Sequence, residues 1–121
     1  MMRRLPFVLL FAAATAPAAT TYPNFMNGVT LMESCEPEYH FECTDYIKGF
    51  SDLHNNLRAA GLVKELWCAP PKTTAAQLRQ ALLTYGEAHR DELNQPGSTL
   101  VIEALQKAFP CGAGAETAPA R

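Results

Sequence analysis

Four cysteines carry the most evident chemistry in this chain, and their even number favours pairing. Cys35, Cys43, Cys68 and Cys111 follow an export signal, so disulfides are favoured over metal ligation. Of three possible connectivities we favour Cys35 with Cys43, which straddles a short turn, and Cys68 with Cys111, which ties a mid-chain loop to the last helix. A zinc site built from Cys35, His40 and Cys43 is the alternative, but its C-x4-H-x2-C spacing lacks a second half. We therefore expect two disulfides, no metal and no cofactor.

The three histidines and the cysteines do not have the pattern of a catalytic site. His40 stands in the turn between the first cysteine pair, His54 on the edge of a helix face and His89 at a helix end. A partly buried, hydrogen-bonded imidazole is expected for His54, and a protonated His89 would favour a helix dipole. A cysteine nucleophile would have to stay reduced, which an even set after export argues against. The sequence therefore predicts a protein that is not an enzyme.

Residues 1–18 have the three parts of a secretory signal peptide. Arg3 and Arg4 precede an apolar run over residues 5–14, and Ala16, Pro17 and Ala18 form a small-residue cleavage site. The apolar run is shorter than the roughly 20 residues that span a bilayer, and no cysteine stands where a lipid anchor would need one. We expect cleavage near Ala18 and a periplasmic product that is not attached to the membrane.

The expected mature chain, residues 19–121, has the size of one small domain. A chain of roughly 100 residues buries only about 60 to 65% of its unfolded surface, so disulfides would support a small core. Without Arg3 and Arg4, eight basic side chains face twelve acidic ones, a formal net charge of −4. This balance argues against nucleic acid and anionic membranes as partners and is compatible with a neutral or basic protein.

Hydrophobic periodicity predicts an all-α fold, a small disulfide-stapled bundle of about four helices with no strand. The expected helices cover residues 28–35, 41–60, 74–89 and about 98–109, followed by a frayed tail over residues 112–121. Asn27, Thr74 with Gln77, and Ser98 or Thr99 are the expected N-terminal caps, and Gly61 is the expected C-terminal cap of the second helix. The first helix is expected to present Val29, Met32 and Cys35 on one face. The predicted inner faces of the later helices are Cys43, Tyr46, Ile47, Phe50, Leu53 and Leu57, then Leu78, Leu82 and Tyr85, then Val101, Ile102, Leu105, Ala108 and Phe109.

Two further residues have more than one interpretation. Trp67 lies in a connection over residues 62–73 that contains two prolines, and we interpret it as a core residue or, less favoured, an interface anchor. Gly49 in the middle of a helix costs roughly 1 kcal/mol relative to alanine. We therefore expect it to let another helix approach closely, either from the same chain, which is favoured, or from a second copy.

Four segments taken together resemble one known family. They are Leu31 to Cys35, Phe41 to Gly49, Trp67 to Pro70, and Leu100 to Cys111 with its Ala-Phe-Pro-Cys ending. With the four cysteines in order, they resemble the Rap/Tai family of periplasmic immunity proteins against type VI secretion amidase effectors, over residues 27–111. The domain expected at residues 19–111 is of this type. The chain departs from the family at Arg90, where proline is frequent, and at Gly97 and Ser98, where alanine is frequent.

The resemblance implies an all-helical protein, usually a homodimer, that plugs the catalytic cleft of a peptidoglycan-cutting cysteine amidase. Disulfide-supported rigidity would lower the entropy cost of such binding. We expect the loop over residues 64–73 and the turn over residues 90–97 to make the contacts, since both are polar, prominent and fixed at their ends. Asp91 and Glu92 would meet a basic rim or form an ordinary solvated turn. The candidate contact residues are Lys64, Trp67, Lys72, Arg90, Asp91, Glu92 and Asn94.

Two other functions stay open, because fold does not fix function. One is a periplasmic scaffold that keeps the fold without an effector to neutralise. The other is an acid-stress chaperone-like protein that exposes apolar helix faces at low pH. An amidase effector gene beside this one would favour immunity, and holdase activity at low pH without effector binding would favour the chaperone.

Overall fold

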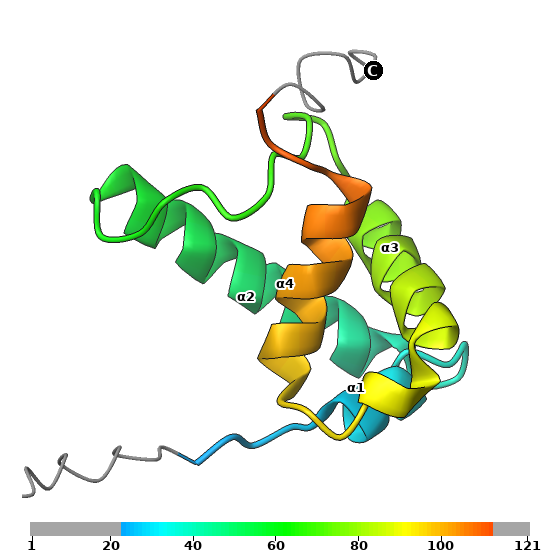
Figure 1. Cartoon of the computed structure of the whole chain (residues 1–121). Helices are drawn as coiled ribbons and strands as arrows, with labels where there is room; N and C mark the ends of the chain where they lie inside the picture. The colour runs from blue at the N-terminus through cyan, green and yellow to red at the C-terminus, as the bar shows by residue number, and fades with distance from the viewer. Residues whose placement is uncertain (1–22, 113–121) are drawn as a thin grey trace, which may run out of the picture.

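The computed structural model describes residues 23–112, which form four α-helices and one short 3-10 turn (Figure 1). The elements are α1 (Gly28–Ser34), α2 (His40–Ala59), α3 (Ala75–Ala88), η1 (Arg90–Glu92) and α4 (Gly97–Ala108). No strand occurs in this part of the chain, and the predicted all-α class is confirmed. The expected signal peptide and nearly all of the expected tail lie outside the described residues. None of the helices over residues 23–112 is both long enough and apolar enough to cross a bilayer.

Local hydrogen bonds explain where three of the helices begin or end. The Asn27 side chain accepts the backbone N–H of Thr30 at 2.9 Å at the start of α1. Thr74 and Gln77 form the predicted capping box at the start of α3, with bonds of 2.8 and 3.2 Å. Gly61, with φ at +72°, ends α2 in the left-handed conformation that glycine adopts without strain. The sequence therefore located these ends correctly.

The N-terminal cap of α4 was predicted two or three residues too late. The helix begins at Gly97 after Pro96, and neither Ser98 nor Thr99 is its cap. Pro96 forms an isolated antiparallel bridge with Asn27, and the backbone N–H of Gly97 donates to the Met26 carbonyl oxygen at 2.8 Å. The segment before α1 therefore supplies an acceptor for the first N–H of α4, a role that a side-chain cap would otherwise have.

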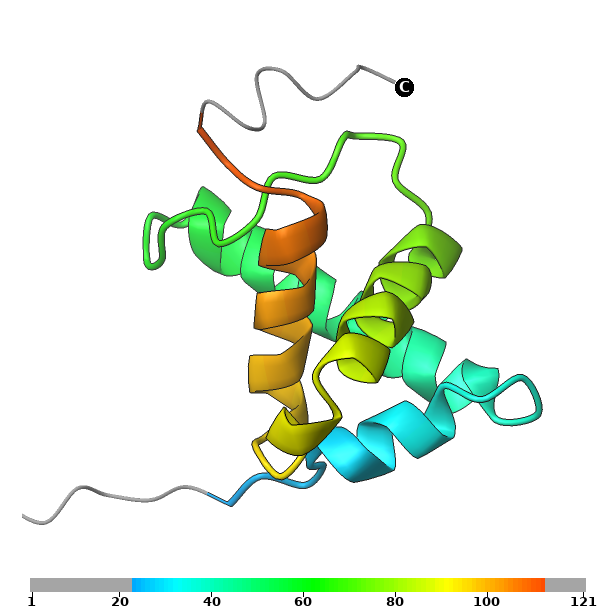
Figure 2. The ribbon, with the colours of Figure 1, turned by 45° about the vertical axis from the view of Figure 1, so that its right-hand side comes forward.

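The core lies where α3 and α4 pack side by side and α1 crosses their lower ends (Figure 2). Its fully buried side chains come from all four helices: Leu31, Ile47, Leu82, Leu100, Val101 and Leu105. Arg79 of α3 also reaches the C-terminal end of α1, where its Nε and Nη2 donate to the Cys35 carbonyl oxygen at 3.2 and 2.5 Å. This side chain satisfies a carbonyl that the end of α1 leaves free.

Three helix faces differ in part from the predicted ones, those of α1 and α4 and, as described below, that of α2. Of the predicted α1 face, Cys35 is buried, whereas Val29 is exposed and Met32 half-buried; the buried positions within the helix are Gly28, Leu31 and Ser34. The reason is close backbone packing, since a Cβ on Gly28 would lie 2.6 Å from the Leu93 carbonyl oxygen. In α4 the predicted Ala108 is exposed and Ala104 is buried instead.

The second half of α2 projects away from α3 and is covered by a loop instead of a helix (Figure 1). Residues 62–73, here called the crossing loop, run back along this half of α2 to the start of α3. They cover His54, which is buried, and leave the predicted core residue Leu53 exposed. Gly49 is open, since a Cβ at this position would meet nothing within 4 Å in the described chain. The favoured prediction of a neighbouring helix from the same chain was therefore wrong.

Candidate functional site

The four cysteines form two disulfides between successive cysteines, Cys35 with Cys43 and Cys68 with Cys111. Their Cα atoms are 4.8 and 5.0 Å apart, and these are the pairs that the sequence analysis favours. The first closes residues 36–42, here called the closed turn, which comprise the connection after α1 and the first residues of α2. The second ties the crossing loop to the chain just after α4, where the Cys68 N–H also donates to the Phe109 carbonyl oxygen at 2.8 Å.

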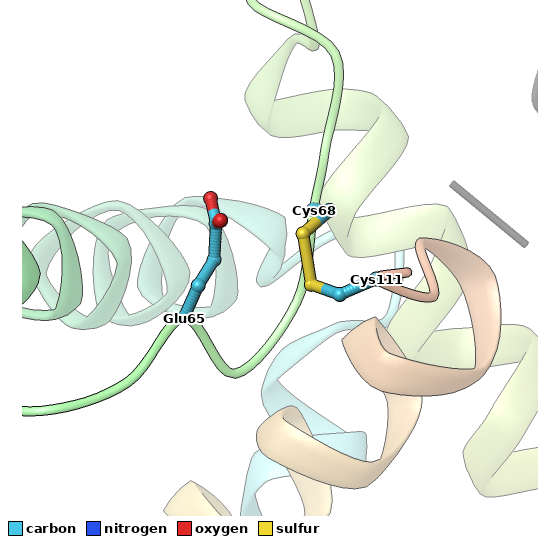
Figure 3. A group of neighbouring side chains, drawn as sticks. All are labelled: Glu65, Cys68 and Cys111. Atoms are coloured by element: carbon cyan, nitrogen blue, oxygen red, sulfur yellow. A yellow bond between two sulfur atoms is a disulfide. The ribbon is translucent and has the colours of Figure 1, made fainter. Parts of the chain in front are cut away.

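Neither group of potential metal ligands can act as a metal site. Cys35 and Cys43 are bonded to each other, and the nearby His40 uses Nδ1 to donate to the Pro37 carbonyl oxygen at 2.6 Å. Figure 3 shows the Glu65 carboxylate beside the bridge of Cys68 and Cys111. Sulfur in a disulfide offers no thiolate to a metal, so this group has one ligand and not three.

The crossing loop is held to α2 by side chains. Trp67 is only 5% exposed, with its ring 4.0 Å from that of His54 and 5.9 Å from that of Phe50. The backbone N–H of Leu66 donates to His54 Nε2 at 3.1 Å, and Arg58 pairs with Glu65 at 2.8 Å. Trp67 is therefore a core residue, as the preferred interpretation predicts, and its covered side chain offers little surface to a partner. Lys64 and Lys72 remain the exposed candidates in this loop.

His54 is the buried imidazole that its place in the sequence predicts. Because Nε2 accepts the Leu66 N–H, the proton of the neutral ring is on Nδ1. Nδ1 itself is buried without a hydrogen-bond partner in the described part of the chain. Burial is the main cause that lowers the pKa of His54; Asn55 and Glu65 act in the opposite direction, and the positive charge of Arg58 lowers it. The neutral form is therefore the one that fits this position, and it serves to hold the loop.

The segment over residues 90–96, here called the pinned turn, is held by backbone bonds instead. The N–H of Gly28 donates to the Gln95 carbonyl oxygen at 2.8 Å, and that of Val29 donates to the Leu93 carbonyl oxygen at 3.1 Å. These bonds satisfy N–H groups at the start of α1. The turn exposes its candidate contact residues to solvent: Arg90, Asp91, Glu92 and Asn94.

A polar cluster supports the pinned turn from the side of α4. Gln95 Nε2 donates to Glu103 at 2.7 Å, and the Tyr85 hydroxyl lies 3.5 Å from the same carboxylate. The ring of His89 stacks on that of Tyr85 at 3.9 Å. Burial raises the pKa of Tyr85, and the negative charges of Glu103 and Glu92 raise it further. A tyrosine held protonated in this way is a hydrogen-bond donor and not a nucleophile.

The two predicted contact segments lie at opposite ends of α3 (Figure 1). This helix has 14 residues and is therefore about 21 Å long, so one narrow cleft could not hold both segments. A third prominent segment, the closed turn, exposes Tyr39 and Phe41 and was not proposed as a contact. The signal for it was present in the sequence, as two aromatic residues between paired cysteines.

Comparison with known proteins identifies one family. The family described as Rap1a immunity proteins has a sequence model that matches residues 27–111. This range includes all four cysteines and all four helices, from the cap of α1 to the second disulfide. No curated protein and no solved structure matched the chain.

Proposed function

Because the chain belongs to the family of Rap1a immunity proteins, we propose that it is a periplasmic immunity protein against a peptidoglycan amidase effector of a type VI secretion system. The family implies a toxin effector as partner. Protection is by binding: the protein occupies the catalytic cleft of the amidase and performs no chemistry there. The signal peptide expected at residues 1–18 and the two disulfides support the periplasmic location, because disulfides persist in oxidising compartments.

The pinned turn is the observation that carries this proposal. Its backbone is bonded to the start of α1 at two carbonyl oxygens, while Asp91 and Glu92 are exposed at its tip. A segment that is already ordered loses little conformational entropy when it enters a cleft. We therefore assign occlusion to the pinned turn, with its acidic side chains facing a basic rim of the effector. Lys64 and Lys72 of the crossing loop stay as candidate contacts outside the cleft.

A homodimer is the proposed assembly, and α2 supplies its interface. Tyr46, Phe50, Leu53 and Leu57 form an apolar stripe along this helix, with Leu53 exposed and the other three half-buried. Gly49 borders this stripe, and nothing in the described chain lies against it. A helix from a second copy fits there, since a glycine permits a close approach that any side chain would block.

The oligomeric proposal is tested by measuring the mass of the oxidised protein, residues 19–121, by size exclusion with light scattering. We expect a dimer for the natural chain and a monomer for Leu53→Glu, because the charge would be buried in the interface. Leu62→Glu, at an exposed position outside the stripe, is the matched control and stays dimeric. If the natural chain is monomeric at high concentration, the proposed interface is wrong.

The functional proposal is tested with the amidase effector encoded beside the gene. The oxidised protein is used in a pulldown with that effector and then in an amidase assay on purified peptidoglycan. Stoichiometric inhibition is expected. No binding by any neighbouring effector would contradict the immunity function and move the scaffold function to the front, and holdase activity at low pH would then favour the chaperone.

A further inference from the structure

The closed turn presents two aromatic side chains to solvent on an ordered backbone. Tyr39 is 59% exposed and Phe41 71% exposed. The turn is fixed by bonds from the Tyr39 N–H to the Glu36 carbonyl oxygen at 3.0 Å and from the Glu42 N–H to the Tyr39 carbonyl oxygen at 3.2 Å. The disulfide of Cys35 and Cys43 closes it. The two aromatic side chains are therefore held outside the core, an arrangement typical of anchor residues in protein interfaces.

The charged side chains of the closed turn itself are all acidic. The turn contains Glu36, Glu38 and Glu42, with Glu33 and Asp45 at its flanks, and no lysine or arginine occurs between residues 28 and 47. Asp45 pairs with Lys48 at 3.7 Å, whereas the four glutamates form no ion pair within residues 23–112. Arg79 keeps its positive charge near the turn, where its guanidinium donates to the Cys35 carbonyl oxygen, but it does not line the groove beside Tyr39.

A groove beside Tyr39 has the shape and chemistry for a cationic side chain. It has a volume of about 380 Å³ and is lined by Thr30, Glu33, Ser34, Glu36, Tyr39 and Glu42. The aliphatic part of an arginine or lysine from a partner could pack on the tyrosine ring, with its charged group between three carboxylates. The planar guanidinium of arginine suits such a site best, because it stacks on aromatic faces and binds carboxylates in pairs.

The groove borders a second one that reaches the pinned turn. A neighbouring groove of about 290 Å³ shares Glu33 and Glu36 with it and runs along α1 to Arg90 and Leu93. The closed turn and the pinned turn therefore lie at the two ends of α1, on one surface. A partner that receives the pinned turn in its cleft would meet the closed turn beside it.

We propose that the closed turn is a second docking surface for the toxin effector, in which Tyr39 and Phe41 anchor on a basic region that flanks the effector's cleft. An arginine or lysine of the effector occupies the groove between Tyr39 and the glutamates. This inference rests on the proposed function and extends it to a named surface and to the charge of the partner. A second copy of this chain is the poorer occupant, because the same four glutamates would face each other.

The test uses the oxidised protein, residues 19–121, and the amidase effector encoded beside its gene, with the dissociation constant measured at low and high salt. The double variant Tyr39→Ala with Phe41→Ala is expected to bind at least about 30-fold more weakly, as for the loss of interface hot spots. Glu36→Gln with Glu42→Gln is expected to slow association and to flatten its salt dependence. Leu62→Ala, as exposed as Phe41 at 71% but at the far end of α2, is the matched control and keeps the natural affinity.

The possible outcomes distinguish a failure of the docking surface from a failure of the immunity function. If the natural protein binds and inhibits, and both variants do so equally well, the docking surface is wrong and the immunity function stands. If the natural protein binds no effector, both proposals fall. If the aromatic variant changes the mass of the free protein from dimer to monomer, the occupant is a second copy and the proposal is overturned. The glutamate variant keeps the test open if the aromatic variant does not fold, because those side chains form no ion pair in the described chain.

Discussion

The crossing loop and the pinned turn are both ordered connections at the ends of α3, but different groups hold them. The pinned turn is bonded through its backbone to the start of α1. The crossing loop is held by the rings of Trp67 and His54 and by the disulfide at Cys68. Backbone bonds do not depend on the identity of a side chain or on its protonation state. The crossing loop should therefore respond to mutation, reduction and pH, whereas the pinned turn should respond mainly to changes in backbone packing.

The largest expected effect comes from removing the disulfide of the crossing loop. Cys68→Ala with Cys111→Ala opens a loop with a sequence separation of 43 residues, and we expect the free energy of unfolding to fall by about 4 kcal/mol. Cys35→Ala with Cys43→Ala opens a separation of 8 and should cost about 2.5 kcal/mol. Urea unfolding followed by the fluorescence of Trp67, the single tryptophan, measures both. Equal losses would show that loop length does not govern these two bridges.

A substitution that disturbs the backbone packing of the pinned turn should have the next largest effect on stability. Gly28→Ala places a Cβ 2.6 Å from the Leu93 carbonyl oxygen, and a shift of the turn should lower the free energy of unfolding by about 1 to 3 kcal/mol. Gly49→Ala is the matched control, because a Cβ there meets nothing within 4 Å. At a concentration where the chain is monomeric, it should raise the free energy of unfolding by up to about 1 kcal/mol. A Gly28→Ala protein as stable as the natural one would mean that the turn is free to move.

The protonation of His54 distinguishes the two segments at acid pH. The folded protein holds the pKa of His54 below its ordinary value, chiefly through burial, so the unfolded chain binds the proton more readily. The contribution of this residue to stability is complete above about pH 6.5 and is lost as the pH falls from there through the folded pKa. Urea unfolding between pH 8 and pH 5 should show a shallower loss for His54→Gln than for the natural chain. If the free energy of unfolding has the same pH dependence in both proteins, His54 is not the pH-sensitive contact of the crossing loop.

The smallest effect is expected from the surface ion pairs. They should contribute equally little to the crossing loop and to the pinned turn. Glu65→Gln removes the partner of Arg58 beside the crossing loop, and Glu87→Gln removes that of Arg90 beside the pinned turn. Both pairs are solvent-exposed, so each change should alter the free energy of unfolding by no more than about 0.5 kcal/mol. A loss above about 1 kcal/mol at only one of them would show that charge contributes to fixing that segment.

Local patterns predicted the helices well, because their signals lie within a few residues of each element. Thr74 and Gln77 marked the start of α3, and Gly61 marked the end of α2, as the structure has them. The turn between Cys35 and Cys43 was short enough to suggest their pairing. Such features depend on neighbours along the chain, and a single sequence contains that information.

The features that the sequence did not reveal depend on contacts between distant segments. The face of α1 is set by Gly28 against Leu93, and the start of α4 is set by Pro96 against Asn27. Leu53 is exposed although periodicity favoured it for the core, because the crossing loop packs Trp67 against the ring of His54 instead. None of these pairings has a signal in the spacing of residues.

The connectivity of the two disulfides has a consequence for how the protein is made. Each cysteine is joined to the next one along the chain, the first to the second and the third to the fourth. If the chain is exported from its N-terminus, as proposed above, and is oxidised as it emerges, both bonds would form in their native order. No bond would have to be broken and exchanged for another. Maturation of this protein should therefore need an oxidant but no disulfide isomerase.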